Sequence, residues 1–290
     1  MNYRHAFHAG NFADVMKHAL LCRILLHLGR KEAPYRFIDT HAGIGLYDLG
    51  GDEASRTGEW RDGIGRLDEP LDEEAETLLA PYRHALAEVR ARYGPSSYPG
   101  SPLVARELMR RQDRAILVEK HPEDAALLAS TAQAARAGKV LPMDGWTALG
   151  SLVPPRERRG LVLVDPPYEE LDELARGAGR LARAHRKWPT GILALWYPVK
   201  REREVEAALA RFVEIAAPAP STALRLELRL EPADDARLTG SGLLVVNPPW
   251  TLQGEAEILL GALAERLGRR RPSCRIEWLG GGAAPLGAGA

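Results

Sequence analysis

One turn of the chain carries residues that could bind an amine and activate it. Residues 161–164 are four branched apolar residues in a row, typical of a strand buried on both faces of a parallel sheet. Pro166 and Pro167 must end that strand, because proline cannot donate to a sheet ladder. Asp165 is thereby expected at the carboxyl end of a central strand, where open α/β sheets bind ligands. The Asp165 carboxylate and the Pro166 carbonyl could accept hydrogen bonds from an exocyclic amine, while Tyr168 stacks on its ring.

A second stretch is typical of nucleotide binding. Residues 35–39 predict a short strand, and the turn after it contains Gly43 and Gly45, which permit a tight turn and a close approach of backbone to ligand. A dinucleotide fingerprint would require a third glycine where this chain has Asp48. The pattern therefore favours a loop that holds S-adenosylmethionine over one that holds NAD.

The remaining patterns predict the elements that position these two turns. A helix should begin at Asn11 or Asp14 and end at Gly29, and the strand at 115–119 ends in Glu119, the candidate ribose ligand. Further strands are expected at 139–143, 191–198, 224–230, 241–246 and 275–279, with helices at 122–136, 147–152, 171–187, 200–212 and 254–267. The alternation predicts an α/β, Rossmann-like sheet.

The distance between the first two strands indicates an insertion. A dinucleotide-type fold brings the second acidic residue about 20 residues after the first turn, and Glu119 comes far later. Residues 47–98 are therefore expected to form an inserted helical subdomain, with an amphipathic helix at 72–93 that Pro81 kinks or splits. Ser101 is expected to cap the next helix, which runs to about Arg111. A lid over the substrate and a purely structural role for the insertion both stay open.

Composition limits the class of protein. The 39 basic and 39 acidic residues balance, so a nucleic-acid partner would need a local basic face. Two distant cysteines fit a reducing cytoplasm, and no signal sequence or 18-residue apolar run occurs, so a cytoplasmic protein without membrane contact is expected. No metal-ligand spacing occurs among the N-terminal histidines, so no metal is expected. Arginines cluster at 106–114, 156–159 and 269–271, and each run could equally be a solvated face.

Two turns resemble the signature of amino-group methyltransferases that use S-adenosylmethionine. One is residues 165–168, Asp-Pro-Pro-Tyr, and the other is residues 247–250, Asn-Pro-Pro-Trp. In a doubly wound sheet the strand before Asp165 is fourth and lies next to the strand of the glycine loop, whereas the strand before Asn247 is expected at the far edge. Direct methyl transfer needs donor and acceptor within a few ångströms, so catalysis is assigned to Asp165 and Asn247 is interpreted as structural.

Longer motifs are more specific than either turn. The chain contains Tyr-Arg-His-Ala-Phe-His-Ala-Gly-Asn at residues 3–11, Asp-Thr-His-Ala-Gly-Ile-Gly at 39–45, Tyr-Pro-Gly-Ser-Pro at 98–102 and Asp-Gly at 144–145. With Asp-Pro-Pro-Tyr, and in this order along essentially the whole chain, they closely resemble the RlmJ family. Those bacterial enzymes methylate N6 of adenine 2030 in 23S ribosomal RNA.

The resemblance implies a single methyltransferase domain over residues 1–290, with the insertion at 47–98. The Gly- and Ala-rich tail at 280–290 is expected to be disordered because of its composition and terminal position. It implies a monomer that acts on protein-free 23S ribosomal RNA with S-adenosyl-L-methionine as methyl donor and no metal. It implies that Asp165 is the catalytic residue and that Tyr3 contacts the RNA. Pro166 and Tyr168 are expected to serve catalysis with Asp165, and Tyr168 to contact the RNA by stacking on a flipped adenine. The residues expected to contact the cofactor are His18, His41, Gly43, Ser101, Glu119, Asp144, Gly145 and Asp165.

Three alternatives remain beside this interpretation. A DNA adenine-N6 methyltransferase would use the same turn. A protein-glutamine methyltransferase is disfavoured, because its motif normally begins with Asn where this chain has Asp165. A non-catalytic module that binds S-adenosylmethionine or RNA would not need a turn that grips an amine.

Overall fold

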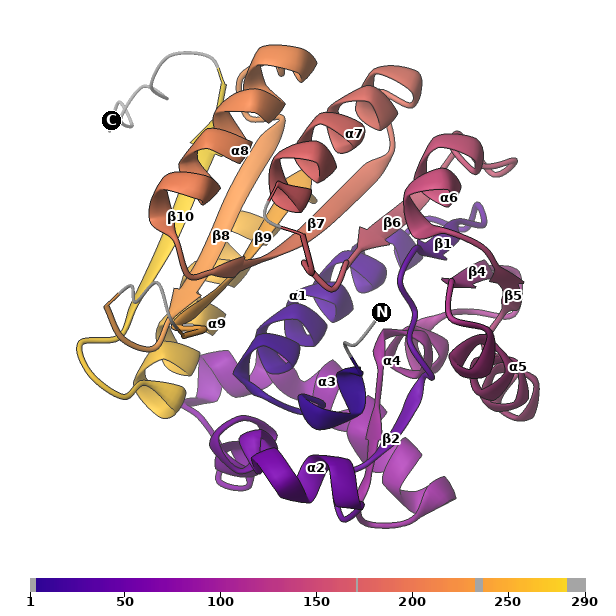
Figure 1. Ribbon diagram of the computed structural model, residues 1–290, viewed down its shortest axis with the longest axis vertical. Helices are drawn as coiled ribbons and strands as arrows, with labels where there is room; N and C mark the ends of the chain where they lie inside the picture. The colour runs from indigo at the N-terminus through magenta and orange to yellow at the C-terminus, as the bar shows by residue number, and fades with distance from the viewer. Residues whose placement is uncertain (1–3, 171, 233–236, 281–290) are drawn as a thin grey trace.

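An eight-stranded sheet runs through the molecule in the order β10-β8-β9-β7-β6-β1-β4-β5 (Figure 1). The computed structural model describes residues 4–170, 172–232 and 237–280. The strands are β1 (Arg36–Asp39), β4 (Arg114–Glu119), β5 (Lys139–Pro142), β6 (Gly160–Val164), β7 (Ile192–Val199), β8 (Ala223–Arg229), β9 (Gly240–Val246) and β10 (Ser273–Leu279). The five from β7 to β5 are parallel, and β9 pairs antiparallel with both β7 and β8. The predicted α/β, Rossmann-like fold is confirmed.

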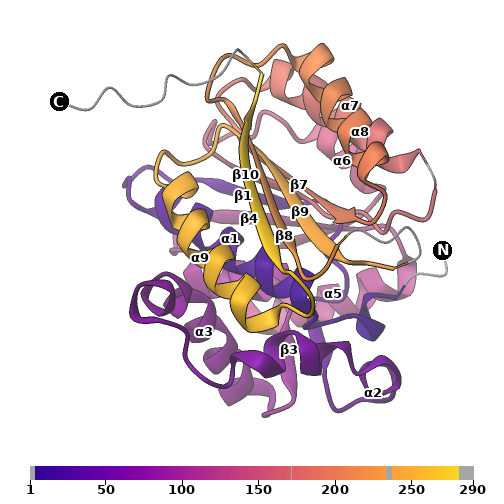
Figure 2. The ribbon, with the colours of Figure 1, turned by 90° about the vertical axis from the view of Figure 1, so that its left-hand side faces the viewer.

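Helices cover both faces of the sheet (Figures 1 and 2). Successive strand residues point to opposite faces, so Phe37 and Leu163 belong to one core while Ile38 and Val162 belong to the other. The first core packs against α1 (Phe12–Gly29), α3 (Glu73–Tyr93), α4 (Ser101–Leu108), α5 (Pro122–Ala135) and α9 (Leu252–Leu267). The second packs against α6 (Gly145–Ser151), α7 (Glu173–Lys187) and α8 (Glu202–Ala216). None of the helices in the described part of the chain is both long and apolar enough to cross a membrane.

Helix α1 lies at the centre of the first core, and its start was predicted correctly. The Asn11 side chain caps it by accepting hydrogen bonds from the backbone N–H groups of Ala13 and Asp14, at 3.0 and 3.1 Å. The helix is enclosed by α3, α4, α9 and the sheet, so it is buried on more sides than its apolar stripe indicates. As a result Asp14, Lys17 and His18 are buried as well.

The segment between β1 and β4 contains α2 (Asp52–Thr57), two short 3-10 helices (Glu59–Asp62 and Ile64–Leu67), α3 and the antiparallel pair β2 (Leu46–Asp48) and β3 (Ser97–Pro99). The expectation that Pro81 splits the long helix is wrong, since α3 is continuous through it. Leu79, Tyr82 and Leu86 are buried on either side of the proline, and this packing holds the helix together. That residues 47–98 form a separate subdomain stays a prediction.

Three further expectations differ from the structure. Ser101 is the first residue of α4 and Gly100 is its cap, because the Ser101 hydroxyl donates to Asp39 instead. Helix α4 ends at Leu108 rather than near Arg111, where the buried Asp113 carboxylate accepts hydrogen bonds from Arg110. The strand before Asn247, β9, lies inside the sheet and not at its far edge. Tyr3 and residues 281–290 of the predicted tail lie outside the described residues.

Candidate active site

A cavity of about 1350 Å³ opens where β1, β4 and β6 end. The strand of the glycine loop, β1, pairs with β4 on one side and β6 on the other, as the sequence predicts. Every predicted site residue that the structure describes lines this cavity, namely His18, His41, Gly43, Ser101, Glu119, Asp144, Gly145, Asp165, Pro166 and Tyr168. The carboxyl ends of three neighbouring strands therefore bring the predicted cofactor and catalytic residues to one place.

The glycine loop after β1 is held against the end of β4. Gly43 has a φ of +58°, and a Cβ atom there would lie 2.3 Å from the Tyr47 hydroxyl oxygen, so a larger residue would be strained and would displace Tyr47. Its N–H donates to the Glu119 carboxylate at 3.1 Å, and the same carboxylate accepts from the N–H of His121 at 2.8 Å. Burial raises the pKa of Glu119 in spite of these hydrogen bonds. Glu119 thus orders the loop as well as facing the cavity.

Beneath the cavity, Asp39 supports two lining residues. The Ser101 hydroxyl donates to Asp39 at 2.6 Å, and the His41 N–H donates to its other oxygen at 3.3 Å. Burial, only partly offset by the Ser101 hydrogen bond, raises the pKa of Asp39 to about 7. Burial also lowers the pKa of His41 to about 4, so its ring is neutral near pH 7.

The turn between β5 and α6 closes the cavity near His41. A Cβ atom on Gly145 would lie 2.2 Å from the Thr40 carbonyl oxygen and 2.6 Å from the His41 ring, so a larger residue would push the two turns apart. Asp144 caps α6 by accepting from the Thr147 N–H at 2.8 Å. The Trp146 ring meets His41 edge to face, with 5.4 Å between the ring centroids. This wall is partly aromatic.

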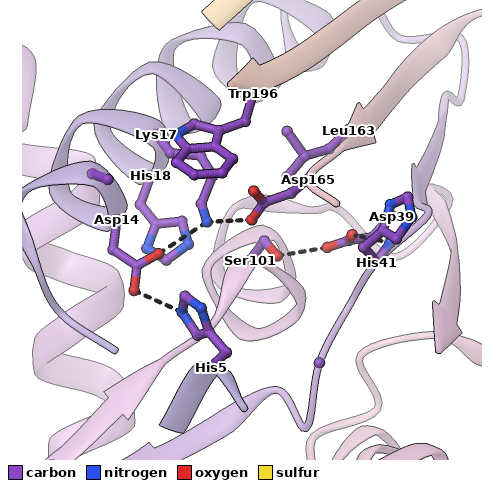
Figure 3. Close-up of polar contacts among 12 residues, drawn as sticks. His5, Asp14, Lys17, His18, Asp39, His41, Ser101, Leu163, Asp165 and Trp196 are labelled. Carbon is purple, nitrogen blue, oxygen red and sulfur yellow. Dashed lines mark hydrogen bonds and ion pairs between the residues drawn. The ribbon is translucent and has the colours of Figure 1, made fainter. Parts of the chain in front are cut away.

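The catalytic candidate Asp165 forms an ion pair with Lys17 of α1 (Figure 3). Lys17 Nζ also lies 2.9 Å from Asp14 Oδ1, and the other oxygen of Asp14 accepts from His5 and from the N–H of Gly10, both at 2.9 Å. Burial alone would lower the pKa of Lys17, but Asp14 and Asp165 outweigh it and raise that pKa well above its ordinary value. Burial likewise opposes the charge on Asp14, yet His5 and Lys17 lower its pKa well below the usual range. Lys17 is therefore a buried cation between two carboxylates.

Two aromatic rings line the wall next to Asp165. The Tyr168 hydroxyl donates to the carbonyl of Trp196 on β7, and the two ring centroids are 5.7 Å apart. The Trp196 indole N–H donates to Ser241 at 2.9 Å, and Lys17 Nζ lies 5.8 Å from the centroid of the Trp196 ring. Figure 3 shows the Trp196 ring beside Lys17 and Asp165.

The sequence interpretation missed Lys17 and Trp196 as site residues. A signal for Lys17 was present, since a lysine and an aspartate three residues apart lie within an otherwise apolar stretch of helix. Buried lysines are rarely found without a partner, so such a pair predicts an ion pair. Trp196 lacked a comparable signal, because an aromatic residue in an apolar strand more often packs in a core.

The second proline turn is remote from this cavity. Since β9 runs antiparallel to β7, Asn247 follows Val246 beside Leu193, at the edge of the sheet opposite Asp165. The Asn247 amide donates to the carbonyls of Pro189 and Gly191 at 2.8 and 2.7 Å. These contacts support the interpretation of Asn247 as structural.

The described part of the chain contains no group of three or more His, Cys, Asp or Glu side chains placed to hold a metal ion. The histidines that the sequence places near the cavity have other partners. His5 contacts Asp14, His8 contacts Glu59, and His18 contacts Tyr98.

Comparison with known proteins points to one family. Residues 32–280 match the family described as "Ribosomal RNA large subunit methyltransferase D, RlmJ". The chain is 39% identical to the ribosomal RNA large subunit methyltransferase J of Escherichia coli, covering 92% of this chain and 94% of that protein. It is 37% identical to the protein of the same name from Haemophilus influenzae, covering 96% and 99%. A crystal structure of a Legionella pneumophila protein is similar, with a TM-score of 0.82, 34% identity and coverage of 93% and 98%.

Proposed function

Because the chain belongs to the RlmJ family of ribosomal RNA large subunit methyltransferases, we propose that it transfers a methyl group from S-adenosyl-L-methionine to N6 of adenine 2030 in 23S ribosomal RNA. The family is that of ribosomal RNA large subunit methyltransferases, and the adenine acceptor, the methyl donor and the target position are the parts that we propose. We further propose that it acts as a cytoplasmic monomer on RNA free of ribosomal proteins, without a metal.

One observation carries the proposal. Asp165, just after β6, lines the same cavity as Gly43, which follows the adjacent strand β1, and Glu119, which ends β4 on the other side of β1. The Asp165 carboxylate, which can accept hydrogen bonds from an amine, thus faces the same cavity as the Gly43 loop, which is suited to a methyl donor. Direct transfer between two bound molecules requires this proximity.

The cavity residues fit S-adenosylmethionine. Gly43 has no side chain to obstruct the close approach of a ligand to the backbone, and Glu119 is placed to accept from ribose hydroxyls. Asp144, Gly145 and the planar ring of Trp146 suit a purine ring, and His18, His41 and Ser101 also line the cavity. When bound, the cofactor supplies an electrophilic methyl group on a sulfonium.

The protein would act mainly by positioning the target amine. Adenine N6 is a poor nucleophile because its lone pair is delocalised into the ring. Lys17 contacts Oδ2 of Asp165, whereas Oδ1 has no hydrogen-bond partner among the described residues and can accept from the amine together with the Pro166 carbonyl. These hydrogen bonds would direct the lone pair towards the methyl group. Asp165 need not remove a proton beforehand, because the amine becomes acidic once it is methylated.

The target adenine must leave its stack to reach Asp165. Tyr168 would replace the lost stacking, since its hydroxyl is tied to the Trp196 carbonyl and its ring is thereby fixed at the cavity wall. Recognition of the RNA would depend on unpaired nucleotides and local shape.

The test is to incubate the protein with labelled S-adenosylmethionine and, separately, deproteinised ribosomal RNA, assembled ribosomal subunits and adenine-containing DNA. Nucleoside mass spectrometry then identifies the product, and mapping of protected RNA fragments locates it. We expect N6-methyladenosine in deproteinised 23S RNA at a single position. Label only in DNA would refute the RNA substrate, and label nowhere would favour a non-catalytic module.

A further inference from the structure

Two buried tyrosines connect the cavity residue His18 to the segment between β1 and β4. His18 Nδ1 lies 3.0 Å from the Tyr98 hydroxyl, which lies 2.8 Å from the Tyr82 hydroxyl. His18 is on α1, Tyr98 on β3 and Tyr82 on α3, and all three side chains are almost completely buried. The two tyrosine rings pack against the His18 ring at 5.9 and 6.0 Å between centroids.

The two tyrosine hydroxyls and the His18 ring each have one hydrogen that can be donated in a hydrogen bond near pH 7. Burial raises the pKa of both tyrosines well above the ordinary value, so both hydroxyls stay protonated. Burial lowers the pKa of His18 to about 3, with Lys17 and His5 acting in the same direction and Asp14 against it. The His18 ring is therefore neutral, and its one hydrogen is on either Nδ1 or Nε2.

The hydroxyl of Tyr82 determines which ring nitrogen of His18 carries the hydrogen. Its only hydrogen-bond partner among the described residues is the Tyr98 oxygen. If Tyr82 did not donate to Tyr98, a buried hydrogen would lack an acceptor, which is unfavourable. Tyr98 then receives from Tyr82 and must donate its own hydrogen to His18 Nδ1, which leaves the ring hydrogen on Nε2.

We propose that Tyr82 and Tyr98 are positioning residues that hold His18 in the tautomer with hydrogen on Nε2, so that the cavity presents a donor to an anionic group of the cofactor. His18 lines the cavity, and its Nε2 has no partner among the described residues. This inference rests on the proposed function, since the anionic group of S-adenosylmethionine is the carboxylate of its methionine part. The opposite tautomer would turn a lone pair towards that carboxylate. The insertion would thus help to define the cofactor site through Tyr82.

The tautomer can be measured without any activity. In protein labelled with ¹⁵N-histidine, the two ring nitrogens of His18 have different shifts according to which one is protonated, and a His18→Gln variant identifies the signals. We expect hydrogen on Nε2 alone in the wild type. In Tyr82→Phe, Tyr98 is free either to donate or to accept, so a population with hydrogen on Nδ1 should appear. Hydrogen on Nδ1 in the wild type, or an unchanged spectrum in Tyr82→Phe, would overturn the proposal.

Calorimetry then tests the link to the cofactor. Tyr98→Phe should weaken binding of S-adenosylmethionine about fivefold, as expected for one net hydrogen bond. Binding of decarboxylated S-adenosylmethionine should change less than about twofold, because the group that His18 contacts is missing. Equal losses for both ligands would show a merely structural role and refute the proposal.

The matched control is Tyr35→Phe. Tyr35 is also completely buried, but its hydroxyl has no hydrogen-bond partner within residues 4–170, 172–232 and 237–280, and it does not line the cavity. This variant should bind both ligands as the wild type does. Absence of any binding of S-adenosylmethionine by the wild type would refute the proposed function, and the tautomer measurement would still decide the roles of Tyr82 and Tyr98.

Discussion

At the scale of single residues, a buried lysine lies between two carboxylates. Lys17, Asp14 and Asp165 are held together by α1 and the end of β6, and Lys17 is only 5% exposed. Removing one partner of a buried ion pair leaves the others uncompensated, at a cost of about 3–5 kcal/mol. Lys17→Met should therefore lower the free energy of unfolding by about 3 kcal/mol in urea denaturation. Lys187→Met removes an exposed lysine and should have little effect; similar losses in both variants would contradict this role.

A substitution of Asp165 is expected to lower the rate of methylation while leaving binding of the methyl donor intact. Asp165→Ala removes the acceptor for the amine but not the loop that holds the methyl donor. The rate of methylation should fall at least about a hundredfold, the usual effect of removing one preorganised group. Binding of S-adenosylmethionine, measured by calorimetry, should stay largely intact. Unchanged turnover would refute the assignment of Asp165 as the catalytic residue.

The buried His18 should make stability depend on pH. Its pKa is lowered from 6.5 to about 3, so the native ring stays neutral while the unfolded chain takes up a proton below pH 6.5. The native state therefore loses stability as the pH falls through this window, by about 1.4 kcal/mol per pH unit at most. Between pH 7 and pH 5 the wild type should lose about 2 kcal/mol relative to His18→Gln in urea denaturation. A constant difference between the two proteins would contradict this estimate.

The site residues that belong to a sequence motif could be predicted individually. Asp165, Gly43 and Glu119 each follow an apolar strand, and the local pattern places all three at the same sheet edge. Lys17 and Trp196 come from elements whose sequences indicate burial only, and their place in the cavity depends on how α1 and β7 pack. The roles assigned to the cavity residues stay predictions.

At the scale of elements, α3 carries an unusual proline. Pro81 lies inside a continuous helix, where it removes one backbone hydrogen bond. Pro81→Ala would restore that bond but would also give the unfolded chain more freedom. The net effect should be a gain of about 1 kcal/mol in the free energy of unfolding. His84→Ala, at an exposed position of the same helix, is the control; loss of stability in Pro81→Ala would mean that packing requires the proline.

Most elements could be predicted because their apolar stretches are distinct and are bounded by residues that begin or end a helix or strand. Strands such as β6 and helices such as α1 were found close to their observed bounds. Periodicity does not show in which direction a strand runs or which strands it pairs with. The antiparallel position of β9 between β7 and β8 is set by tertiary packing. Ser101 has the pattern of a cap, but a buried carboxylate from another strand accepts its hydroxyl hydrogen.

At the scale of the whole molecule, two similar proline turns lie at opposite edges of one sheet. Asn247 ties the β9 turn to two carbonyls far from the cavity, in a left-handed conformation that asparagine tolerates. Asn247→Ala should lower the free energy of unfolding by about 1–2 kcal/mol and leave the rate of methylation unchanged. Trp250→Ala, at the 82% exposed end of the same turn, should change neither quantity. A large fall in the rate of methylation in either variant would mean that both turns serve catalysis.

The N-terminal residues have a practical consequence for anyone who produces this protein. Arg4, His5 and His8 line the cavity, and His5 contacts Asp14 beside Lys17. A purification tag fused in front of the chain would be attached only a few residues before Arg4 and could obstruct the cavity. A tag at the other end of the chain would follow β10, an edge strand that β8, β9 and β7 separate from β6. Recombinant preparations intended for kinetic work should therefore be tagged at the carboxyl terminus, or have the leading tag cleaved off.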